Sequence, residues 1–385
     1  MSISEEALRL HAEWDGKLEV VPKMDLKTRY DLAVAYTPGV AAPCEEIAAN
    51  EEAVYRYTIK SNTVAVVTDG SAVLGLGNIG PEAALPVMEG KCALFKAFAG
   101  VNAFPICLDT QDTDEIVKAC TQIAPVFGGI NLEDISAPRC FEIEERLNDI
   151  LDIPVFHDDQ HGTAIVVLSA LINSLKLAGK EAKDVRVVMS GAGAAGIAIA
   201  KLLLSYGFED IIMCSSRGII SSQLEGINDA QRKMLEVTNR DDLSGTLADA
   251  LVGADVFIGV SAPQIVSRAM VETMNDKAIV FAMANPVPEI YPEDALAAGA
   301  LIVGTGRSDF PNQVNNVIAF PGIFKGALEA RAERITNDMK LKAAIALASL
   351  VSDEELSPDF VMPDPFDPRV ADTVAKAVAE CARTR

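Results

Sequence analysis

Apolar and polar residues follow different patterns on either side of about residue 160. In the first part, apolar runs at 62–70, 103–109, 123–133 and 153–156 predict strands, with helices between them. Pro138 opens a helical segment between the last two of these strands. Strand, helix and strand in so few residues form a βαβ unit, so those two strands should be parallel neighbours.

The second part alternates strand and helix more regularly. Strands are predicted at 184–191, 210–216, 254–261, 277–286 and 300–306, and a long helix at 192–207. This order is typical of a doubly wound parallel sheet. An apolar helix at 163–178 should join the two parts, and the acidic segment 352–385 should form a loop and a last helix. The chain length also favours two domains, which we place at 1–160 and 161–385.

A glycine-rich segment, GAGAAG, lies between the predicted strand at 184–191 and the helix that follows it. In that context the spacing G-x-G-x-x-G predicts a dinucleotide-binding loop of the Rossmann type. Gly191 should permit a tight turn, Gly193 should let the backbone approach a pyrophosphate, and Gly196 should let the helix pack closely. The alternative is a helix start that is merely rich in alanine and glycine. We expect an α/β fold whose second domain binds NAD or NADP.

The end of the next predicted strand bears on the choice between NAD and NADP. An acidic residue about 20 positions after the glycines usually bonds the ribose hydroxyls of NAD. Ser215 stands in that place here, and Arg217 follows it. A missing acid and a nearby arginine favour the 2′-phosphate of NADP over NAD. The alternative is an ordinary surface turn.

One lysine lies on the apolar face of a predicted helix, at 80–100. Glu89 and Lys96 belong to the solvated stripe of that helix, whereas Lys91 falls about 200° from Glu89 around its axis. Burial disfavours the charged ammonium, so we predict a lowered pKa for Lys91, which suits a general base. The alternatives are a lysine whose tip reaches solvent and a lysine that is ion-paired.

Carboxylates follow two neighbouring predicted strands. Glu133 and Asp134 end one strand, and Asp158 and Asp159 end the next parallel strand. Both pairs should therefore lie at the carboxyl edge of the sheet, where open α/β sheets bind ligands. Carboxylates crowded together repel unless a cation joins them, and oxygen ligands favour Mg²⁺ or Mn²⁺ over zinc. The alternative for the two aspartates is to cap the following helix, which should start at about 162–163.

Other polar residues near these strand ends are less specific. His157 and His161 flank the two aspartates, but we do not assign them to the metal. Asn285 ends another predicted strand, and Asn315 and Asn316 lie in a later loop. Turn formation is a common alternative role for asparagine.

Composition narrows the function classes. The chain has 33 Lys+Arg against 55 Asp+Glu and a net charge of −22, which disfavours binding to nucleic acid or to an anionic membrane surface. The seven cysteines show no C-x-x-C pair, so zinc-ribbon and disulfide frameworks are disfavoured. The N-terminus lacks the apolar stretch of a secretory signal, and we see no apolar run of about 18 residues. We expect a cytoplasmic protein outside membranes.

Several motifs together give a specific resemblance. They are AYTPGVAAPC, VTDGSAVLGLGNIGPEAALPVMEGK, NLEDISAP, FHDDQHGTA, GAGAAG, ANPVPE and PNQVNNVIAFPGIFKGAL. Over roughly residues 15–370 the chain resembles the short bacterial form of the malic enzyme family. The resemblance implies oxidative decarboxylation of (S)-malate to pyruvate and CO₂, with NAD(P)⁺ and Mg²⁺ or Mn²⁺. It also implies a homodimer with shared active sites.

The resemblance extends to single residues. It implies that Glu133, Asp134 and Asp159 are metal ligands with Asp158 beside them. Lys91 resembles the general base, and Tyr36 resembles the general acid. Asn285 and Asn316 resemble groups that hold the substrate carboxylate, and Asn285 and Asn315 also resemble cofactor contacts. Ala72 departs from longer eukaryotic relatives, which carry arginine in that segment, so the partner of the second malate carboxylate is left open.

Two other functions remain as alternatives. The first is another NAD(P)-dependent dehydrogenase of similar architecture, such as an amino-acid or methylenetetrahydrofolate dehydrogenase, whose chemistry needs no carboxylate cluster. The second is a non-catalytic nucleotide-binding regulator, which would have no use for an inward lysine beside such a cluster.

Overall fold

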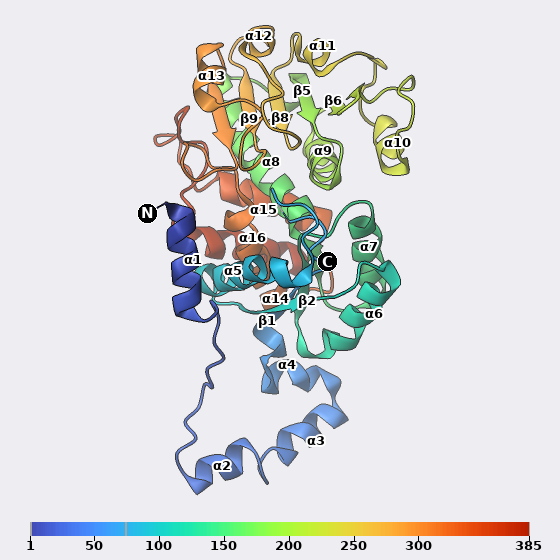
Figure 1. Ribbon diagram of the computed structural model, residues 1–385. Helices are drawn as coiled ribbons and strands as arrows, with labels where there is room; N and C mark the ends of the chain where they lie inside the picture. The colour runs from blue at the N-terminus through green and yellow to red at the C-terminus, as the bar shows by residue number, and fades with distance from the viewer. Residues whose placement is uncertain (1, 74, 385) are drawn as a thin grey trace.

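The computed structural model describes residues 2–73 and 75–384, which form two mainly parallel sheets connected by a long helix (Figure 1). The first sheet has the order β2-β1-β3-β4, and all of its pairings are parallel. Its strands are β1 (Thr63–Thr68), β2 (Asn102–Cys107), β3 (Gly129–Leu132) and β4 (Val155–His157). The predicted strand at 123–133 is too long, because helix α6 ends at Ile123 and Pro125 lies in a 3₁₀ turn.

Burial on both faces explains why β1 is apolar along its whole length. Val64 and Val66 pack into a core with α5 (Pro81–Ala99), whereas Ala65 and Val67 pack into a second core with α6 (Thr113–Ile123) and α7 (Arg139–Ile150). Successive side chains of a strand point to opposite faces, so each face of this sheet has its own helical cover.

The second sheet has the order β10-β9-β8-β5-β6-β7 and is parallel except for the edge strand β7. Its strands are β5 (Arg186–Ser190), β6 (Asp210–Ser215), β7 (Gly218–Ile219), β8 (Val256–Gly259), β9 (Ile279–Ala282) and β10 (Ile302–Thr305). Its helices are α9 (Ala194–Tyr206), α10 (Asp229–Leu235), α11 (Leu247–Leu251), α12 (Arg268–Val271) and α13 (Pro292–Ala297). The prediction of a doubly wound sheet is confirmed, and β7 is the strand that was not predicted.

Helix α8 (Asp158–Ala178) connects the sheets. It begins at Asp158, whereas the sequence predicted a start at about 162–163. The polar residues of its first turn are held by side chains from the first sheet and its helices, which local sequence does not reveal. Helix α8 has the length and mean hydropathy of a membrane span, although polar residues such as Asn173 and Lys176 interrupt its apolar positions. However, 72% of the relevant window is buried, and α8 contacts α9 and α15, so it is a core helix.

The last helices return to the first sheet. They are α14 (Phe320–Ala330), α15 (Asn337–Ala348) and α16 (Arg369–Arg383), and α14 and α16 both contact α5. Phe95 of α5 meets Phe320 and Phe324 of α14 edge-on, with ring centroids 4.7 and 5.4 Å apart. The chain after β10 thus completes the core around α5 and the start of α8.

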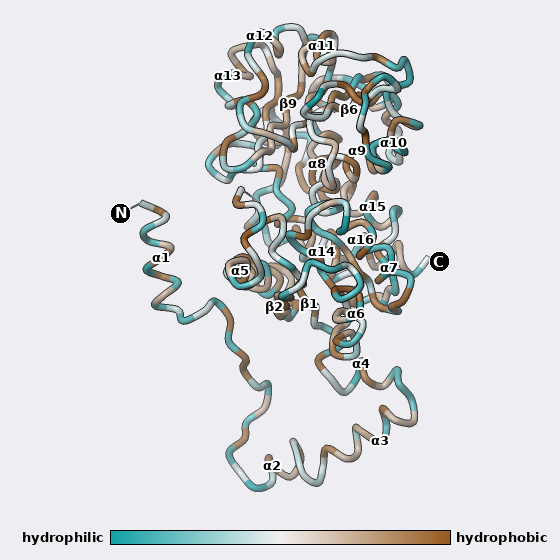
Figure 2. Tube along the Cα trace, turned by 45° about the vertical axis from the view of Figure 1, so that its right-hand side comes forward, coloured by the Kyte–Doolittle hydropathy of each residue, from teal (hydrophilic) through white to brown (hydrophobic). Residues whose placement is uncertain are grey.

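The first 58 residues form an arm that leaves the rest of the molecule (Figures 1 and 2). Helices α1 (Ile3–Trp14), α2 (Arg29–Ala35), α3 (Ala41–Ala49) and α4 (Val54–Tyr57) contain no buried residue. The Lys17 ammonium donates to the Pro86 carbonyl at 2.7 Å, and Glu52 pairs with Arg331 at 2.8 Å. The arm therefore contacts the rest of the chain at Lys17 and at Glu52. Apolar side chains are exposed between these anchors: Val20, Val21, Met24, Leu26, Tyr30, Leu32, Val34 and Tyr36.

Candidate active site

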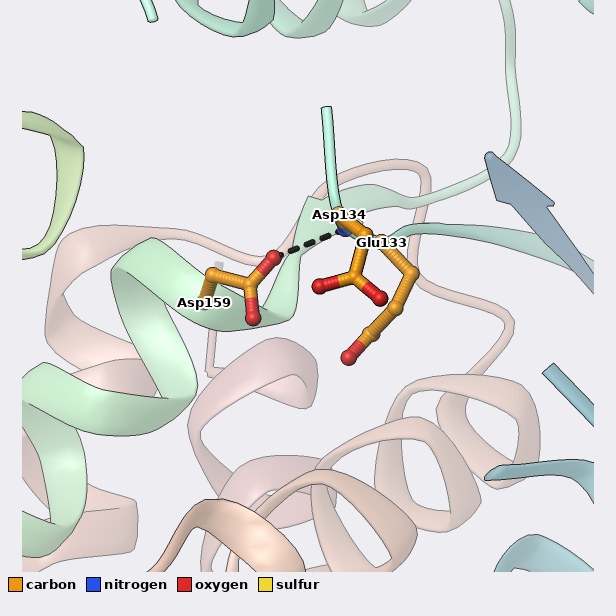
Figure 3. A group of neighbouring side chains, drawn as sticks. All are labelled: Glu133, Asp134 and Asp159. Carbon is orange, nitrogen blue, oxygen red and sulfur yellow. Dashed lines mark hydrogen bonds between the residues drawn. The ribbon is translucent and has the colours of Figure 1, made fainter. Parts of the chain in front are cut away.

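Three carboxylates meet at the carboxyl edge of the first sheet (Figure 3). Glu133 and Asp134 follow β3, and Asp159 lies in the first turn of α8, after the neighbouring strand β4. Each of the three offers an oxygen, and these oxygens lie within 4.8 Å of one another. The Asp134 backbone N–H also donates to Asp159 Oδ2 at 2.9 Å. The predicted clustering of these side chains is therefore present in the fold.

Asp134 occupies an unusual backbone conformation, with φ of +54°. Few residues other than glycine adopt positive φ, although aspartate tolerates it better than most. The Asp134 carbonyl accepts the Ala72 N–H at 2.9 Å, so the loop after β1 helps to hold this turn. The conformation places the Asp134 side chain in the same cluster as its neighbour Glu133.

Lys91 points inward from α5, as predicted, and is 7% exposed. Its Nζ lies 2.8 Å from Glu133 Oε1 and 2.5 Å from Asp158 Oδ2, and 4.1 Å from the centre of the Phe320 ring. The predicted lowered pKa is wrong for the chain by itself. Burial does oppose the charge, but the carboxylates of Asp158, Glu133 and Asp159 outweigh it and raise the pKa of Lys91. Lys91 is therefore a buried, ion-paired ammonium.

Asp158 is fully buried next to Lys91. Burial raises the pKa of Asp158 to about 7, although Lys91 opposes this. Its carboxylate lies over Gly162, where an added Cβ would be 1.8 Å from Asp158 Oδ1 and 3.1 Å from Asn316 Cβ. Neither Asp158 nor Asp159 is the N-cap of α8, because that place belongs to His157, whose side chain makes no capping bond. Simple capping therefore does not account for the two aspartates.

The glycine-rich loop borders a pocket of about 660 Å³ at the edge of the second sheet. Gly191 has φ of +111°, and a Cβ on Gly196 would lie 1.9 Å from the Gly191 carbonyl oxygen. By contrast, a Cβ on Gly193 would meet nothing within 4 Å. This geometry fits a tight turn at Gly191, a close approach at Gly196 and an open backbone at Gly193.

The far side of this pocket carries Ser215 and Arg217. Ser215 Oγ accepts the Arg217 backbone N–H at 3.2 Å, so both residues take part in the turn before β7. The Arg217 guanidinium donates to the carbonyls of Glu225 and Gly226 at 2.6 and 2.8 Å. Among the described residues that line the pocket, none is aspartate or glutamate.

The edges of the two sheets face each other. Ala194 in the glycine-rich loop packs against the core of the first sheet. Gly75, in the loop after β1, approaches the Asn285-Pro286 segment after β9, where a Cβ on Gly75 would lie 3.5 Å from Pro286 Cδ. The start of α9 and the loop after β9, both from the second sheet, are therefore in contact with parts of the first sheet.

The predicted asparagines lie in two loops of this region. Asn316 begins the 3₁₀ turn Asn316–Ile318 and lies against Asp158 and Gly162. Asn315 caps that turn by accepting the Val317 N–H at 3.0 Å, and its amide nitrogen lies 3.4 Å from the Gly306 carbonyl oxygen. The side chain of Asn285 also reaches Gly306.

Tyr36 is not brought together with Lys91 in a single chain. It is the C-cap of α2 in the arm and is 68% exposed. The arm holds α2 away from α5 and the first sheet (Figure 2). No local signal in the sequence tells how far Tyr36 lies from Lys91 in the folded chain.

Comparison with known proteins places these features in one family. The chain matches the malic enzyme N-terminal domain at residues 15–148 and the malic enzyme NAD-binding domain at residues 160–383. The chain belongs to the malic enzyme family. It is 60% identical to the bifunctional malic/malolactic enzyme of Bacillus subtilis over 99% of this chain and 93% of that protein. It is 54% identical to the NAD-dependent malic enzyme of Geobacillus stearothermophilus over 99% of this chain and 79% of that protein.

A solved malic enzyme has the same fold. The NAD-dependent malic enzyme of Thermotoga maritima superposes with a TM-score of 0.94 at 49% identity, covering 97% of this chain and 98% of that one. Malic enzymes named for NADP also resemble this chain, with one from Rhizobium meliloti at 47% identity over 98% of this chain and 52% of that protein. The resemblance drawn from the motifs is thus confirmed at the level of the family.

Two partly buried charges that support this malic enzyme site were missed by sequence reasoning. Arg139 donates to Asp69 at 2.7 Å and to Ser71 and Ser136 at 2.9 and 3.0 Å, which joins the loops after β1 and β3. Glu144 of α7 bonds to the start of α8. A signal existed for Glu144, since it falls on the apolar stripe of α7 as Lys91 does on α5.

The contact between Asp158 and Gly162 gives a first prediction. Gly162→Ala should move the Asp158 carboxylate away from Lys91 and lower malate-dependent NAD(P)⁺ reduction at least ~10-fold, because supporting contacts at metal sites have effects of that order. Gly90→Ala is the matched control, since its Cβ would enter open space. It should keep activity and add about 0.5–1 kcal/mol to helix stability. Activity is measured by steady-state kinetics and stability by thermal melting. Equal activity in both variants would show that Gly162 is not needed to position Asp158.

Proposed function

We propose that this chain catalyses the oxidative decarboxylation of (S)-malate to pyruvate and CO₂, coupled to reduction of NAD(P)⁺ and dependent on a divalent cation. The observation that carries the proposal is the carboxylate cluster of Glu133, Asp134 and Asp159 beside the buried Lys91, in a chain whose second sheet carries the glycine-rich pocket. We also propose that residues 1–160 form the substrate and metal domain and that residues 161–385 form the nucleotide-binding domain.

The donor set fits Mg²⁺ or Mn²⁺, because every offered ligand atom is a carboxylate oxygen. Burial and neighbouring negative charge raise the pKa values of Glu133 and Asp159, so a cation would stabilise their ionised forms. Neither His157 nor His161 belongs to the oxygen cluster. When bound there, the cation would act as a Lewis acid that polarises the C2 oxygen and favours loss of CO₂.

Lys91 is the proposed carrier of the proton from the C2 hydroxyl of malate. Its ammonium is held by Glu133 and Asp158 in the chain alone. A cation held by Glu133 would offset part of the negative charge around Lys91 and so would lower its pKa, which favours the neutral amine that a base requires. Asp158 keeps Nζ in place from the other side, as a neighbour of the metal ligands.

Three other residues have proposed contacts with the reactants. Asn316, which lies against Asp158, and Asn285, after β9, hold the carboxylate that stays in pyruvate. Asn285 and Asn315 also contact the cofactor. Tyr36 delivers a proton to C3 after CO₂ has left. Because Ala72 offers no charge, we propose that these asparagine amides donate hydrogen bonds to the second malate carboxylate, and that the positive nicotinamide ring or another cation offsets its charge.

The cofactor pocket favours NADP over NAD in our proposal. Gly191, Gly193 and Gly196 receive the pyrophosphate, with the N-terminus of α9 behind them. No carboxylate among the described lining residues would repel a 2′-phosphate near Ser215, and Arg217 adds positive charge to that side. The two carbonyls bonded to the Arg217 guanidinium hold it at the rim of the pocket.

The arm favours a homodimer. Its exposed apolar side chains lie between two anchors on their own chain, so a second copy can cover them without unfolding either anchor. We propose that the arm of each chain lies on its partner and carries Tyr36 into the partner's active site, because Tyr36 does not reach Lys91 of its own chain. All seven cysteines are free thiols, in keeping with the cytoplasmic location that we predict.

One assay tests the proposed reaction. Malate is supplied with NAD⁺ or NADP⁺, with Mn²⁺ or with EDTA, and reduced nicotinamide and pyruvate are both measured. We expect equal amounts of the two products, activity only with the divalent cation, and a lower KM for NADP⁺ than for NAD⁺. Reduction of cofactor that persists in EDTA would favour a metal-independent dehydrogenase, and cofactor binding without turnover would favour a regulator.

Complementation between two inactive variants tests the shared site. Lys91→Ala and Tyr36→Phe should each lose most of the activity while still binding NADP⁺, measured by calorimetry. If each site uses Lys91 from one chain and Tyr36 from the other, mixing and reassociating the variants should restore about a quarter of wild-type activity. A mixture that stays inactive, although native mass spectrometry shows dimers that contain one chain of each variant, would place both residues in one chain's site.

A further inference from the structure

Glu144 is a partly buried carboxylate to which the proposed reaction gives no part. It lies on α7, and its side chain is 14% exposed. Glu144 Oε1 accepts the backbone N–H of His157 at 2.9 Å, and Glu144 Oε2 lies 2.9 Å from His161 Nε2. Both oxygens of one carboxylate are therefore used on the beginning of α8.

These two contacts bracket the residues that face the cation site. His157 and His161 are four positions apart, about one helical turn, and Asp158 and Asp159 lie between them. His157 is the N-cap of α8 but makes no side-chain capping bond, so this turn lacks the usual local support. Glu144 supplies that support from another helix and fixes both ends of the turn.

Neighbouring side chains favour the ionised form of Glu144. Burial alone would raise the pKa of Glu144, but His161, Lys340 of α15 and His157 outweigh it and lower the pKa to about 2. Lys340 also lies over the Phe156 ring, 5.8 Å from its centre. Removing a carboxylate from water is costly unless it is paired or hydrogen-bonded, and here its bonds lead directly to the turn that carries Asp159.

We propose that Glu144 is a positioning residue for the cation site, which orients Asp158 and Asp159 by holding the first turn of α8. The proposal rests on the proposed metal site. Partners of this kind, which orient ligands without touching the metal, commonly change metal affinity about 10- to 100-fold when they are removed. The readout that matters is therefore binding of the cation itself, separate from activity.

The test compares Glu144→Gln with Glu145→Gln. Glutamine at 144 has nearly the same shape and can still accept the His157 N–H, but its amide group presents a donor toward His161 in one orientation. Glu145 is the adjacent, exposed residue of α7 and is the matched control. Free Mn²⁺ is measured by electron paramagnetic resonance without substrate, and NADP⁺ binding is measured by calorimetry.

We expect Glu144→Gln to raise the Kd for Mn²⁺ about 10- to 100-fold, with unchanged NADP⁺ affinity and with kcat largely restored by excess Mn²⁺. Glu145→Gln should bind Mn²⁺ as the wild type does. His161→Phe removes the same contact from the other side and should raise the same Kd by a comparable factor, which keeps the test available if Glu144→Gln does not fold.

Two results would overturn the inference. One is wild-type Mn²⁺ affinity in Glu144→Gln and His161→Phe, and the other is an equal loss of Mn²⁺ and NADP⁺ binding, which indicates general destabilisation. Failure of the proposed function is distinguishable from both, because wild-type protein would then bind no Mn²⁺ at all.

Discussion

Repulsion among carboxylates is the interaction on which the rest of this site depends. Glu133, Asp134 and Asp159 present oxygens within 4.8 Å of one another. One ammonium, that of Lys91, offsets part of this charge by contacting Glu133 and also Asp158 behind them. Burial and like charge raise the pKa values of Glu133 and Asp159, so the arrangement is strained in the absence of a further positive charge. A cluster with this excess of negative charge is suited to bind a divalent cation.

The fold keeps the carboxylates from relaxing apart. Adjacent parallel strands β3 and β4 end at the same edge, which fixes the separation of the two acidic segments. Arg139 joins the loops after β1 and β3, and Glu144 holds the first turn of α8. Gly162 leaves room for the Asp158 carboxylate beside Lys91. Structural charges outside the cluster thus maintain a geometry that the cluster by itself would not adopt.

The sequence pattern predicted those features of the protein that depend on residues close together in the chain. Alternation of strand and helix located the sheets, and strand ends located Glu133 and Asp159, because parallel strands share one carboxyl edge. Helical periodicity placed Lys91 inside, but its raised pKa depends on residues 42 or more positions away, beyond any local window. The start of α8 was missed for the same reason, since Glu144 stabilises it from another helix. The exposure of Tyr36 reflects where the arm lies, which no periodicity encodes.

The most direct test of the central claim is anomalous diffraction from crystals of the protein grown with Mn²⁺ and malate. The account predicts one strong manganese peak in each chain, with oxygens of Glu133, Asp134 and Asp159 at about 2.0–2.3 Å, the range for carboxylate ligands of such cations. Lys91 Nζ should lie near the peak without coordinating it. A manganese peak at another site in an active crystal, with this cluster left without metal, would contradict the account.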